Sequence, residues 1–354
     1  MSGPIFVHCL PTSPSTTNEP KEPNVFSILR DLFLNKGYQY ICSDYAAALV
    51  RNGHIRPKDL LLMANETSYN TSSEYLARLG ASRFLLFTHE SPGVAKTFYK
   101  DSDVIKRQYP NHSLFPFWEE NWDGLYPAVF SLSQTPHFKR LQERSFAVLV
   151  SSNKFHRTVS GMRLLKPKKL IRWVNAKFEI GATLYKRQTV SHLHETRLAV
   201  LEAFAEHVDL FGFDWDNLEN IPMFWRRRLR GHLSSKGPVP LSGKLELISN
   251  YRFCFAIENV SAVSYITEKL TDAIMAGCVP VYLGCPQIKD LVPSNAFIDM
   301  RDFNSLADLK QHLLKMSDEG CEAMVKAAQE WLYHTKAGNA FSYERFVDKL
   351  ISRL

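Results

Sequence analysis

The stretch YRFCFAIENVSAVSYITEKLTDAIMAGCVPVYLG, from Tyr251 to Gly284, decides the fold of this chain. It opens with an apolar run (YRFCFAIEN), continues into a segment whose apolar residues have helical spacing (ITEKLTDAIMAGC, from Ile266), and ends in a second apolar run (VPVYLG, from Val279). Two short buried strands joined by a helix are typical of a parallel βαβ unit. The stretch therefore predicts a parallel sheet that helices cover on both faces.

The same alternation of short apolar runs and helical segments extends on both sides of this stretch. The other expected strands begin at Ile5, Tyr38, Asp59, Arg83, Ser145, Val208 and Ala296. The pattern predicts an α/β chain with two parallel sheets in tandem and a ligand cleft at the carboxyl ends of the strands. We expect domains at 1–140 and 141–335, followed by a helical tail at 336–354.

Composition limits the classes of protein that need to be considered. The chain has 354 residues, 45% of them hydrophobic, and a net charge of +7, which excludes a disordered or collagen-like protein. No stretch approaches the roughly 20 apolar residues of a membrane span. The six cysteines lack CxxC spacing and are expected to be buried thiols. Neither GxGxxG nor GxxxxGKS occurs, so dehydrogenase and P-loop functions are not indicated.

Polar residues interrupt the deciding stretch where its first strand ends and its helix begins. Glu258 and Asn259 follow the strand, whereas Glu268 and Lys269 lie in the first helical turn, which Thr267 can cap. Free amide groups of a first turn form an anion site. There Glu268 can accept hydrogen bonds from sugar hydroxyls while Lys269 neutralises a phosphate. In the alternative, Glu268 only complements the helix dipole and Lys269 is a solvated surface residue.

This segment resembles the signature of the α1,3-fucosyltransferase family, glycosyltransferase family ten. That signature has an FEN element, a tyrosine six residues later, then ITEK and a V-P-V strand. The positions in register are Glu258, Asn259, Tyr265, Glu268, Lys269 and Pro280, whereas Ala256 and Ile257 vary the approach. In the family, the Glu and the Asn–Tyr pair line nucleoside and sugar, and the Lys contacts the diphosphate. The resemblance implies donor-binding roles for Glu258, Asn259, Tyr265, Glu268 and Lys269, and a GT-B fold of two Rossmann-like domains.

Two further resemblances lie upstream. FTHESPG (87–93) is similar to the family's E-S-P element, which makes Glu90 the candidate general base, although a carboxylate there could also only cap the next helix. LVSSNK followed by the helix of ETRLAVLEAFAEHVDLFGF implies that Arg197 meets the diphosphate and that Phe211 and Gly212 replace a Tyr-Gly pair. The basic residues of the insertion at 154–194 compete for the phosphate role; these are Arg157, Lys166, Lys168 and Lys169.

The resemblance implies an inverting transferase that moves L-fucose from GDP-fucose to a hydroxyl of a glycan, in α1,3 linkage to N-acetylglucosamine. Residues 1–140 would bind the acceptor and 141–335 the donor. The expected partners are GDP-fucose and an oligosaccharide or glycoprotein acceptor, with no nucleic acid. Fixed cations make a metal unnecessary in principle, so no cofactor is expected and a divalent cation would at most stimulate. Trp118, Trp122 and Tyr126 are candidates to stack on the acceptor sugar, or simply to pack.

Two compartments are compatible with the resemblance. Animal and plant members are anchored in the Golgi by an N-terminal span, whereas bacterial and viral members can be soluble. We therefore expect either a soluble cytoplasmic protein or a Golgi-lumenal one whose anchor is outside this sequence.

Alternative functions rest on three weaker motifs. Asp214 and Asp216 spell the D-x-D of metal-dependent glycosyltransferases, although a loop cap is the simpler interpretation. His192, His194 and Glu195 are residue types that bind metals, but they do not form a three-ligand set at a recognised spacing. The basic run WRRRLRGH from Trp225 fits a solvated face or a lid over phosphate better than a nucleic-acid site. A non-catalytic relative that only binds nucleotide or glycan is the remaining alternative.

Overall fold

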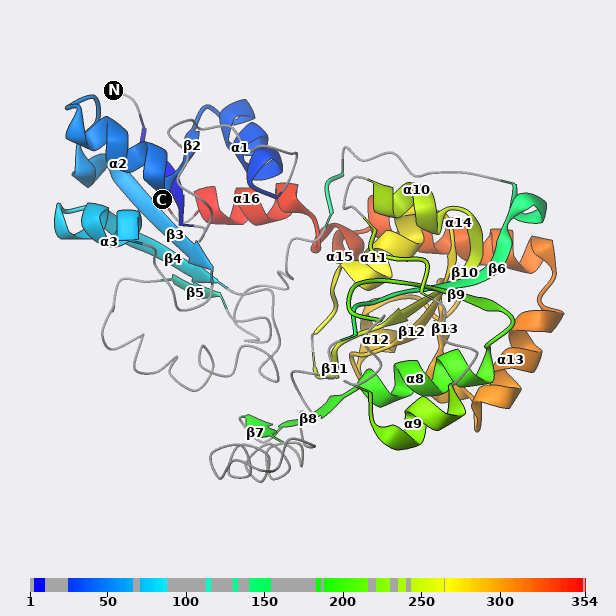
Figure 1. Cartoon of the computed structure of the whole chain (residues 1–354). Coiled ribbons are helices and arrows are strands. Elements are labelled where there is room, and N and C mark those ends of the chain that lie inside the picture. The colour runs from blue at the N-terminus through cyan, green and yellow to red at the C-terminus, as the bar shows by residue number, and fades with distance from the viewer. Residues whose placement is uncertain are drawn as a thin grey trace, which may run out of the picture. The chain divides into compact units, whose positions relative to one another are not determined.

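The computed structural model describes residues 3–9, 25–65, 71–87, 113–115, 130–132, 140–153, 183–185, 188–215, 221–229, 235–239, 243–263, 265–352 and 354. The chain forms two compact units (Figure 1). One unit combines Met1–Leu132 with Ala340–Leu354, and the other is Ser133–Asn339. The last residues of the chain, expected as a separate tail, therefore pack with the first unit.

The first unit contains a five-stranded parallel sheet in the order β2-β1-β3-β4-β5. Its strands are β1 (Ile5–Cys9), β2 (Gln39–Cys42), β3 (Leu60–Asn65), β4 (Ser82–Phe87) and β5 (Ser113–Phe115). Its helices are α1 (Val25–Asn35), α2 (Ser43–Arg51), α3 (Thr71–Arg78) and α16 (Tyr343–Ile351), with a 3-10 turn at Pro57–Asp59. Figure 1 shows α1 and α16 on one side of this sheet and α2 and α3 on the other.

The C-terminal helix completes the core of the first unit. Phe346 and Leu350 of α16 are buried against α1 and the sheet, in one apolar cluster with Phe6 and Phe33. The Phe33 ring stacks on Tyr40 with centroids 4.9 Å apart. A helix from the end of the sequence therefore covers the first strands of the chain.

The second unit contains a five-stranded parallel sheet in the order β13-β12-β10-β6-β9. Its strands are β6 (Ser145–Val150), β9 (Val208–Phe211), β10 (Tyr251–Ile257), β12 (Val279–Leu283) and β13 (Ile298–Asp299). A smaller antiparallel sheet consists of β7 (Thr183–Tyr185), β8 (Gln188–His192) and β11 (Val260–Ser261). The two parallel sheets confirm the predicted α/β class.

Helices cover both faces of the second parallel sheet (Figure 1). They are α8 (His194–Ala203), α9 (Met223–Arg228), α10 (Lys244–Ile248), α11 (Glu268–Met275), α12 (Ile288–Leu291), α13 (Leu306–Lys315), α14 (Asp318–His334) and α15 (Lys336–Asn339), with 3-10 turns at Leu141–Glu143 and Met300–Asp302. α10 and α11 pack against each other, as do α11 and α14, and α8 packs against α13. The side chains of Ser305 and Ser317 cap α13 and α14, and each accepts a hydrogen bond from a first-turn amide N–H.

All six cysteines lie in the described part of the chain and are free thiols; five are buried and Cys42 is partly exposed. This agrees with their predicted role as small apolar residues. Within the described ranges, no helix is both long and apolar enough to cross a bilayer.

Candidate functional site

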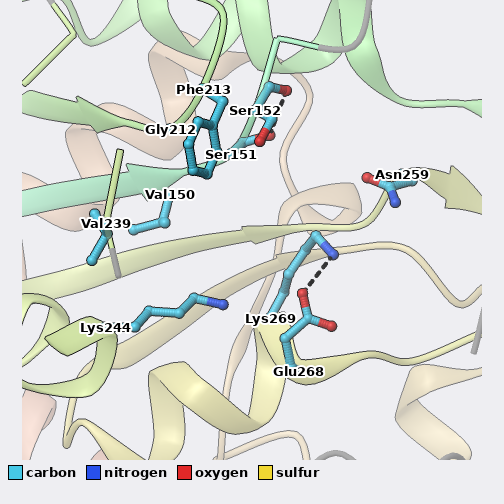
Figure 2. Close-up of a pocket in the computed structure, with 10 residues that line it drawn as sticks. All are labelled: Val150, Ser151, Ser152, Gly212, Phe213, Val239, Lys244, Asn259, Glu268 and Lys269. Carbon is cyan, nitrogen blue, oxygen red and sulfur yellow. Dashed lines mark hydrogen bonds and ion pairs between the residues drawn. The ribbon is translucent and has the colours of Figure 1, made fainter. Parts of the chain in front are cut away.

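A pocket of ≈ 220 Å³ opens at the carboxyl edge of the second parallel sheet (Figure 2). The ends of β6, β9 and β10 and the starts of α10 and α11 contribute to its wall. Its lining residues are Val150, Ser151, Ser152, Gly212, Phe213, Val239, Lys244, Asn259, Glu268 and Lys269. Two ammonium groups and a carboxylate therefore share one small space, which suits an anionic ligand that also carries hydroxyl groups.

The start of α11 forms one wall of this pocket. Thr267 is its N-cap: the backbone is extended, and Oγ1 accepts the amide N–H of Lys269 at 3.5 Å. The body of the helix, from Leu270 to Met275, is buried, so its position is fixed by packing. The first turn consequently presents its partial positive charge at the pocket.

Glu258 holds the N-cap from inside the protein. Its side chain is fully buried, with Oε1 accepting the Thr267 amide N–H and Oε2 accepting the Thr267 hydroxyl, both at 2.7 Å. Burial raises the pKa of Glu258, although the neighbouring Lys269 opposes the rise. Gly284 leaves the space for this carboxylate, since a Cβ there would lie 2.4 Å from Glu258 Cγ. Glu258 is not among the pocket-lining residues, so its predicted donor contact stays a prediction.

Substitution of Glu258 tests whether its hydrogen bonds to Thr267 stabilise the site. We expect Glu258→Ala to lower the free energy of unfolding by about 3–5 kcal/mol, because the Thr267 amide and hydroxyl lose their acceptor and Lys269 loses one of its two counter-charges. Denaturant unfolding measures the change, with the exposed Glu330→Ala on α14 as the matched control. Equal midpoints for the two variants would contradict the bracing role.

Lys269 is the cation at the centre of the pocket. Its Nζ donates to Thr267 Oγ1 at 3.0 Å and lies 3.2 Å from Glu268 Oε1 and 3.5 Å from Glu258 Oε2. Burial favours the neutral amine, but the carboxylates of Glu268 and Glu258 outweigh it and raise the pKa of Lys269. Lys269 is therefore a cation at neutral pH, in position to meet an anionic ligand.

Arg197 lies behind the pocket and orients Asn259. It is 2% exposed, and its Nη2 donates to the Ile257 carbonyl at 2.7 Å and to Asn259 Oδ1 at 3.0 Å. Burial lowers the pKa of Arg197 to about 10, which still leaves a cation at neutral pH. Because Asn259 Oδ1 accepts from Arg197, Asn259 Nδ2 can donate a hydrogen bond to a ligand in the pocket. The predicted contact of Arg197 with a diphosphate stays a prediction.

Tyr265 is also buried rather than pocket-lining. It is 1% exposed, and its carbonyl accepts the Tyr282 hydroxyl at 3.4 Å. Of the six residues expected to bind the donor, Asn259, Glu268 and Lys269 line the pocket, while the other three form its inner support.

The sequence Phe211-Gly212 ends β9 at the opposite wall. Phe211 is buried in the core, whereas Gly212 lines the pocket with a φ of +144°. A Cβ on Gly212 would lie 2.0 Å from the Ser151 carbonyl oxygen. This position therefore requires glycine for both its conformation and its close backbone contact.

Gly212→Ala tests that requirement. Gly237 provides a matched control, because it also has a positive φ (+93°) but no heavy atom near an added Cβ. We expect Gly212→Ala to cost about 1–3 kcal/mol more stability than Gly237→Ala, because only the former forces backbone atoms apart. Thermal and denaturant unfolding give this difference, and a smaller loss for Gly212→Ala than for the control would overturn it.

The residues of the metal alternatives are only partly described by the structure. Asp214 has a φ of 65°, and its carbonyl accepts the Asn153 side-chain amide at 3.0 Å, while Asp216 lies outside the described residues. The rings of His192 and His194 stack 5.8 Å apart, and His194 Nδ1 lies 3.3 Å from Arg197 Nη1. Among the residues with described positions, no cluster of three or more His, Cys, Asp or Glu could hold a metal ion.

Several sequence-predicted residues fall outside the described ranges. They are the candidate base Glu90, the insertion residues Arg157, Lys166, Lys168 and Lys169, and the aromatic residues Trp118, Trp122 and Tyr126. Conversely, the structure adds Lys244, which lines the pocket from the start of α10. No motif in the sequence marks Lys244, which lies in a segment predicted only as a short helix.

Five of the ten pocket-lining residues lie in a region that is recognisable in other proteins. The model of the C-terminal domain of glycosyltransferase family 10 (fucosyltransferase) matches residues 228–346. This region resembles the family 10 fucosyltransferases. An alpha-(1,4)-fucosyltransferase of Arabidopsis thaliana is 39% identical over 72 residues, which are 20% of this chain and 18% of the relative. Human alpha-(1,3)-fucosyltransferase 4 is 44% identical over 80 residues, 22% of this chain and 15% of the relative.

The name of a third relative specifies a protein as the acceptor. GDP-fucose protein O-fucosyltransferase 3 of Gallus gallus is 34% identical over 103 residues, 28% of this chain and 22% of the relative. The matches of this chain to these three relatives span less than a quarter of each relative's own length.

Solved structures resemble the chain over nearly its whole length. A crystal structure of an alpha1,3-fucosyltransferase has a TM-score of 0.51 at 13% identity and covers 99% of this chain and 90% of its own. Anabaena HepE, solved with UDP and glucose, scores 0.53 at 9% identity, with 99% and 100% coverage. Sucrose-phosphate synthase from Thermosynechococcus elongatus scores 0.54 at 12% identity, with 99% and 98% coverage. The fold is GT-B, as expected.

Proposed function

We propose that this protein transfers L-fucose from GDP-fucose to a hydroxyl of a glycan, with inversion at the anomeric carbon. The observation that carries the proposal is the pocket at the start of α11, where Asn259, Glu268 and Lys269 of the family 10 region meet. The α1,3 linkage to N-acetylglucosamine is the finer part of the proposal, and it rests on the family resemblance of the signature segment.

The charges of GDP-fucose are complementary to those of the pocket. The diphosphate carries the negative charge that Lys269 and the first-turn amides of α11 attract. Glu268 and Asn259 supply an acceptor and a donor for the sugar hydroxyls. As the bond between C1 of fucose and the diphosphate oxygen breaks, charge grows on the leaving GDP, and the fixed cations stabilise it.

The acceptor side of the reaction requires a base. The acceptor oxygen forms the new bond to C1 of fucose, GDP departs with the electron pair of the old bond, and the hydroxyl proton passes to Glu90. Inversion follows from this single displacement, which has no covalent intermediate. Base assistance of this kind contributes roughly 10²- to 10⁴-fold to rate.

We further propose that the reaction needs no cofactor. Lys269 and the helix N-terminus carry out the neutralisation that a divalent ion performs in D-x-D enzymes. A divalent cation would then stimulate at most, for instance by aiding GDP release.

Product analysis tests this function. The purified chain is incubated with GDP-fucose and a panel of N-acetyllactosamine and N-glycan core acceptors, with and without EDTA; mass spectrometry detects transfer and NMR gives the linkage. We expect a fucosylated product in α linkage, formed equally with EDTA. Loss of product in EDTA and recovery with Mn²⁺ would instead favour metal dependence. GDP binding without any product would favour a non-catalytic relative.

A further inference from the structure

Two carboxylates lie one turn apart on the pocket-facing helix. Glu268 and Asp272 are separated by four residues on α11, the spacing at which side chains of a helix are neighbours and like charges repel. The Glu268 side chain is 45% exposed, so a ligand can reach it, whereas that of Asp272 is 13% exposed. Without a counter-charge, repulsion from Asp272 would displace Glu268, which lines the pocket.

Lys244 supplies that counter-charge from a different helix. Its Nζ lies 2.5 Å from Asp272 Oδ2, and its side chain is 17% exposed. Lys244 also lines the pocket, and Figure 2 shows its ammonium directed into the space occupied by Glu268 and Lys269. The contact between α10 and α11 therefore pairs Lys244 with Asp272 and brings its ammonium into the same pocket as Glu268.

The charges around Glu268 balance only when Lys244 is counted. The other groups that act on this cluster are Lys269 and Asp272 on α11, Arg197 on α8 and Glu258 after β10. Three cations then face three carboxylates, and loss of Lys244 leaves two cations against three. Desolvation alone would raise the pKa of Glu268, but Lys269 and Lys244 hold it well below its usual range. Asp272 and Glu268 in turn raise the pKa of Lys244 against the effect of burial.

We propose that Lys244 is a positioning residue of the donor site: by neutralising Asp272 it holds Glu268 in place as an acceptor for the donor sugar and leaves Lys269 available to the phosphates. This inference rests on the proposed function for its ligand, but not for its charge balance. Lys244 acts through Glu268 and not on the diphosphate itself.

The first test separates sugar recognition from diphosphate recognition. We expect Lys244→Met to weaken GDP-fucose binding about tenfold at pH 7, the size of one hydrogen bond to a charged group. The affinity of Lys244→Met for GDP, which lacks the sugar, should fall by less than half that factor. Lys244→Arg should retain both affinities, and the exposed Lys326→Met on α14 is the control. Thermal unfolding should show that Lys244→Met and Lys244→Arg are folded. If folded Lys244→Met loses equal factors of affinity for GDP and for GDP-fucose, the positioning role is contradicted.

The second test follows the protonation of Glu268 and needs no substrate. Without the Lys244 charge the carboxylate binds its proton at a higher pH, so donor affinity should be lost earlier as pH falls. A carbon-13 NMR titration of Glu268 should show a higher midpoint in Lys244→Met and the wild-type midpoint in Lys244→Arg. An unchanged midpoint in Lys244→Met would overturn the inference. If the wild type neither binds nor uses GDP-fucose, the proposed function fails, while this titration still decides the role of Lys244.

Discussion

Lys269→Met is expected to lower kcat/KM for GDP-fucose by about 10²- to 10³-fold, the loss seen when one preorganised group that stabilises transition-state charge is removed. The ammonium of Lys269 sits at the first turn of α11, 3.0 Å from the capping hydroxyl of Thr267, so it is fixed before the ligand arrives. The bond that breaks leaves charge on the diphosphate, and methionine keeps the length of the side chain but not the charge. Steady-state kinetics with varied GDP-fucose measure the loss.

Controls separate this effect from damage to the fold. Lys269 also lies close to Glu258 and Glu268, so its loss removes one counter-charge from each of these carboxylates. Lys269→Arg keeps the charge and should recover part of the activity, whereas Lys326→Met on the exposed face of α14 should leave kinetics unchanged. A folded Lys269→Met variant with wild-type kcat/KM would remove Lys269 from the mechanism.

Glu90→Gln is expected to reduce kcat by roughly 10²- to 10⁴-fold, because an amide cannot accept the acceptor's proton. The variant keeps the size of the side chain, and the donor site lies in the other unit, on residues that the substitution leaves unchanged. GDP affinity should therefore stay within a factor of two while turnover collapses. This pattern differs from that of Lys269→Met, which should weaken GDP binding as well.

Turnover at saturating donor and acceptor, together with a GDP titration, distinguishes the two outcomes for Glu90. Glu330→Gln serves as a matched control on an exposed helix surface. Wild-type kcat in Glu90→Gln would assign proton removal to another group.

The α/β architecture was predictable from the sequence because buried parallel strands need no polar face. Runs such as 251–257 and 279–283 are almost continuously apolar, and the structure pairs them directly, with Phe253 opposite Val279. The C-terminal helix was less predictable. Its apolar residues show that one face is buried, but not that this face covers α1 and the first strands of the chain, within the first unit.

The signature segment predicted which residues gather at α11, but not which of them face the pocket. Glu258 and Asn259 are adjacent, yet the Glu258 carboxylate turns inward to Thr267 while Asn259 lines the pocket. Side-chain direction at the end of a strand depends on the turn that follows, which spacing alone does not reveal. The sequence also did not indicate that Arg197 donates hydrogen bonds to the Ile257 carbonyl and to Asn259 Oδ1.

Lys244 was beyond the reach of motif analysis. It begins a five-residue helix with no side-chain cap, in a segment separated from Glu268 by more than 20 residues. Only the packing of α10 against α11 brings its ammonium to Asp272. Ion pairs between helices leave no spacing signal in a single sequence, whereas pairs within one helix do.

We propose that the pocket at the start of α11 binds the guanosine diphosphate part of a nucleotide sugar. Calorimetric titration of GDP into the wild type, Lys269→Met and Lys326→Met tests it most directly, with UDP as the comparison ligand. We predict one GDP site per chain in the wild type and in Lys326→Met, at least tenfold weaker binding in Lys269→Met, and weaker binding of UDP than of GDP in the wild type. Equal GDP affinity in all three proteins, or no GDP binding by the wild type, would contradict the account.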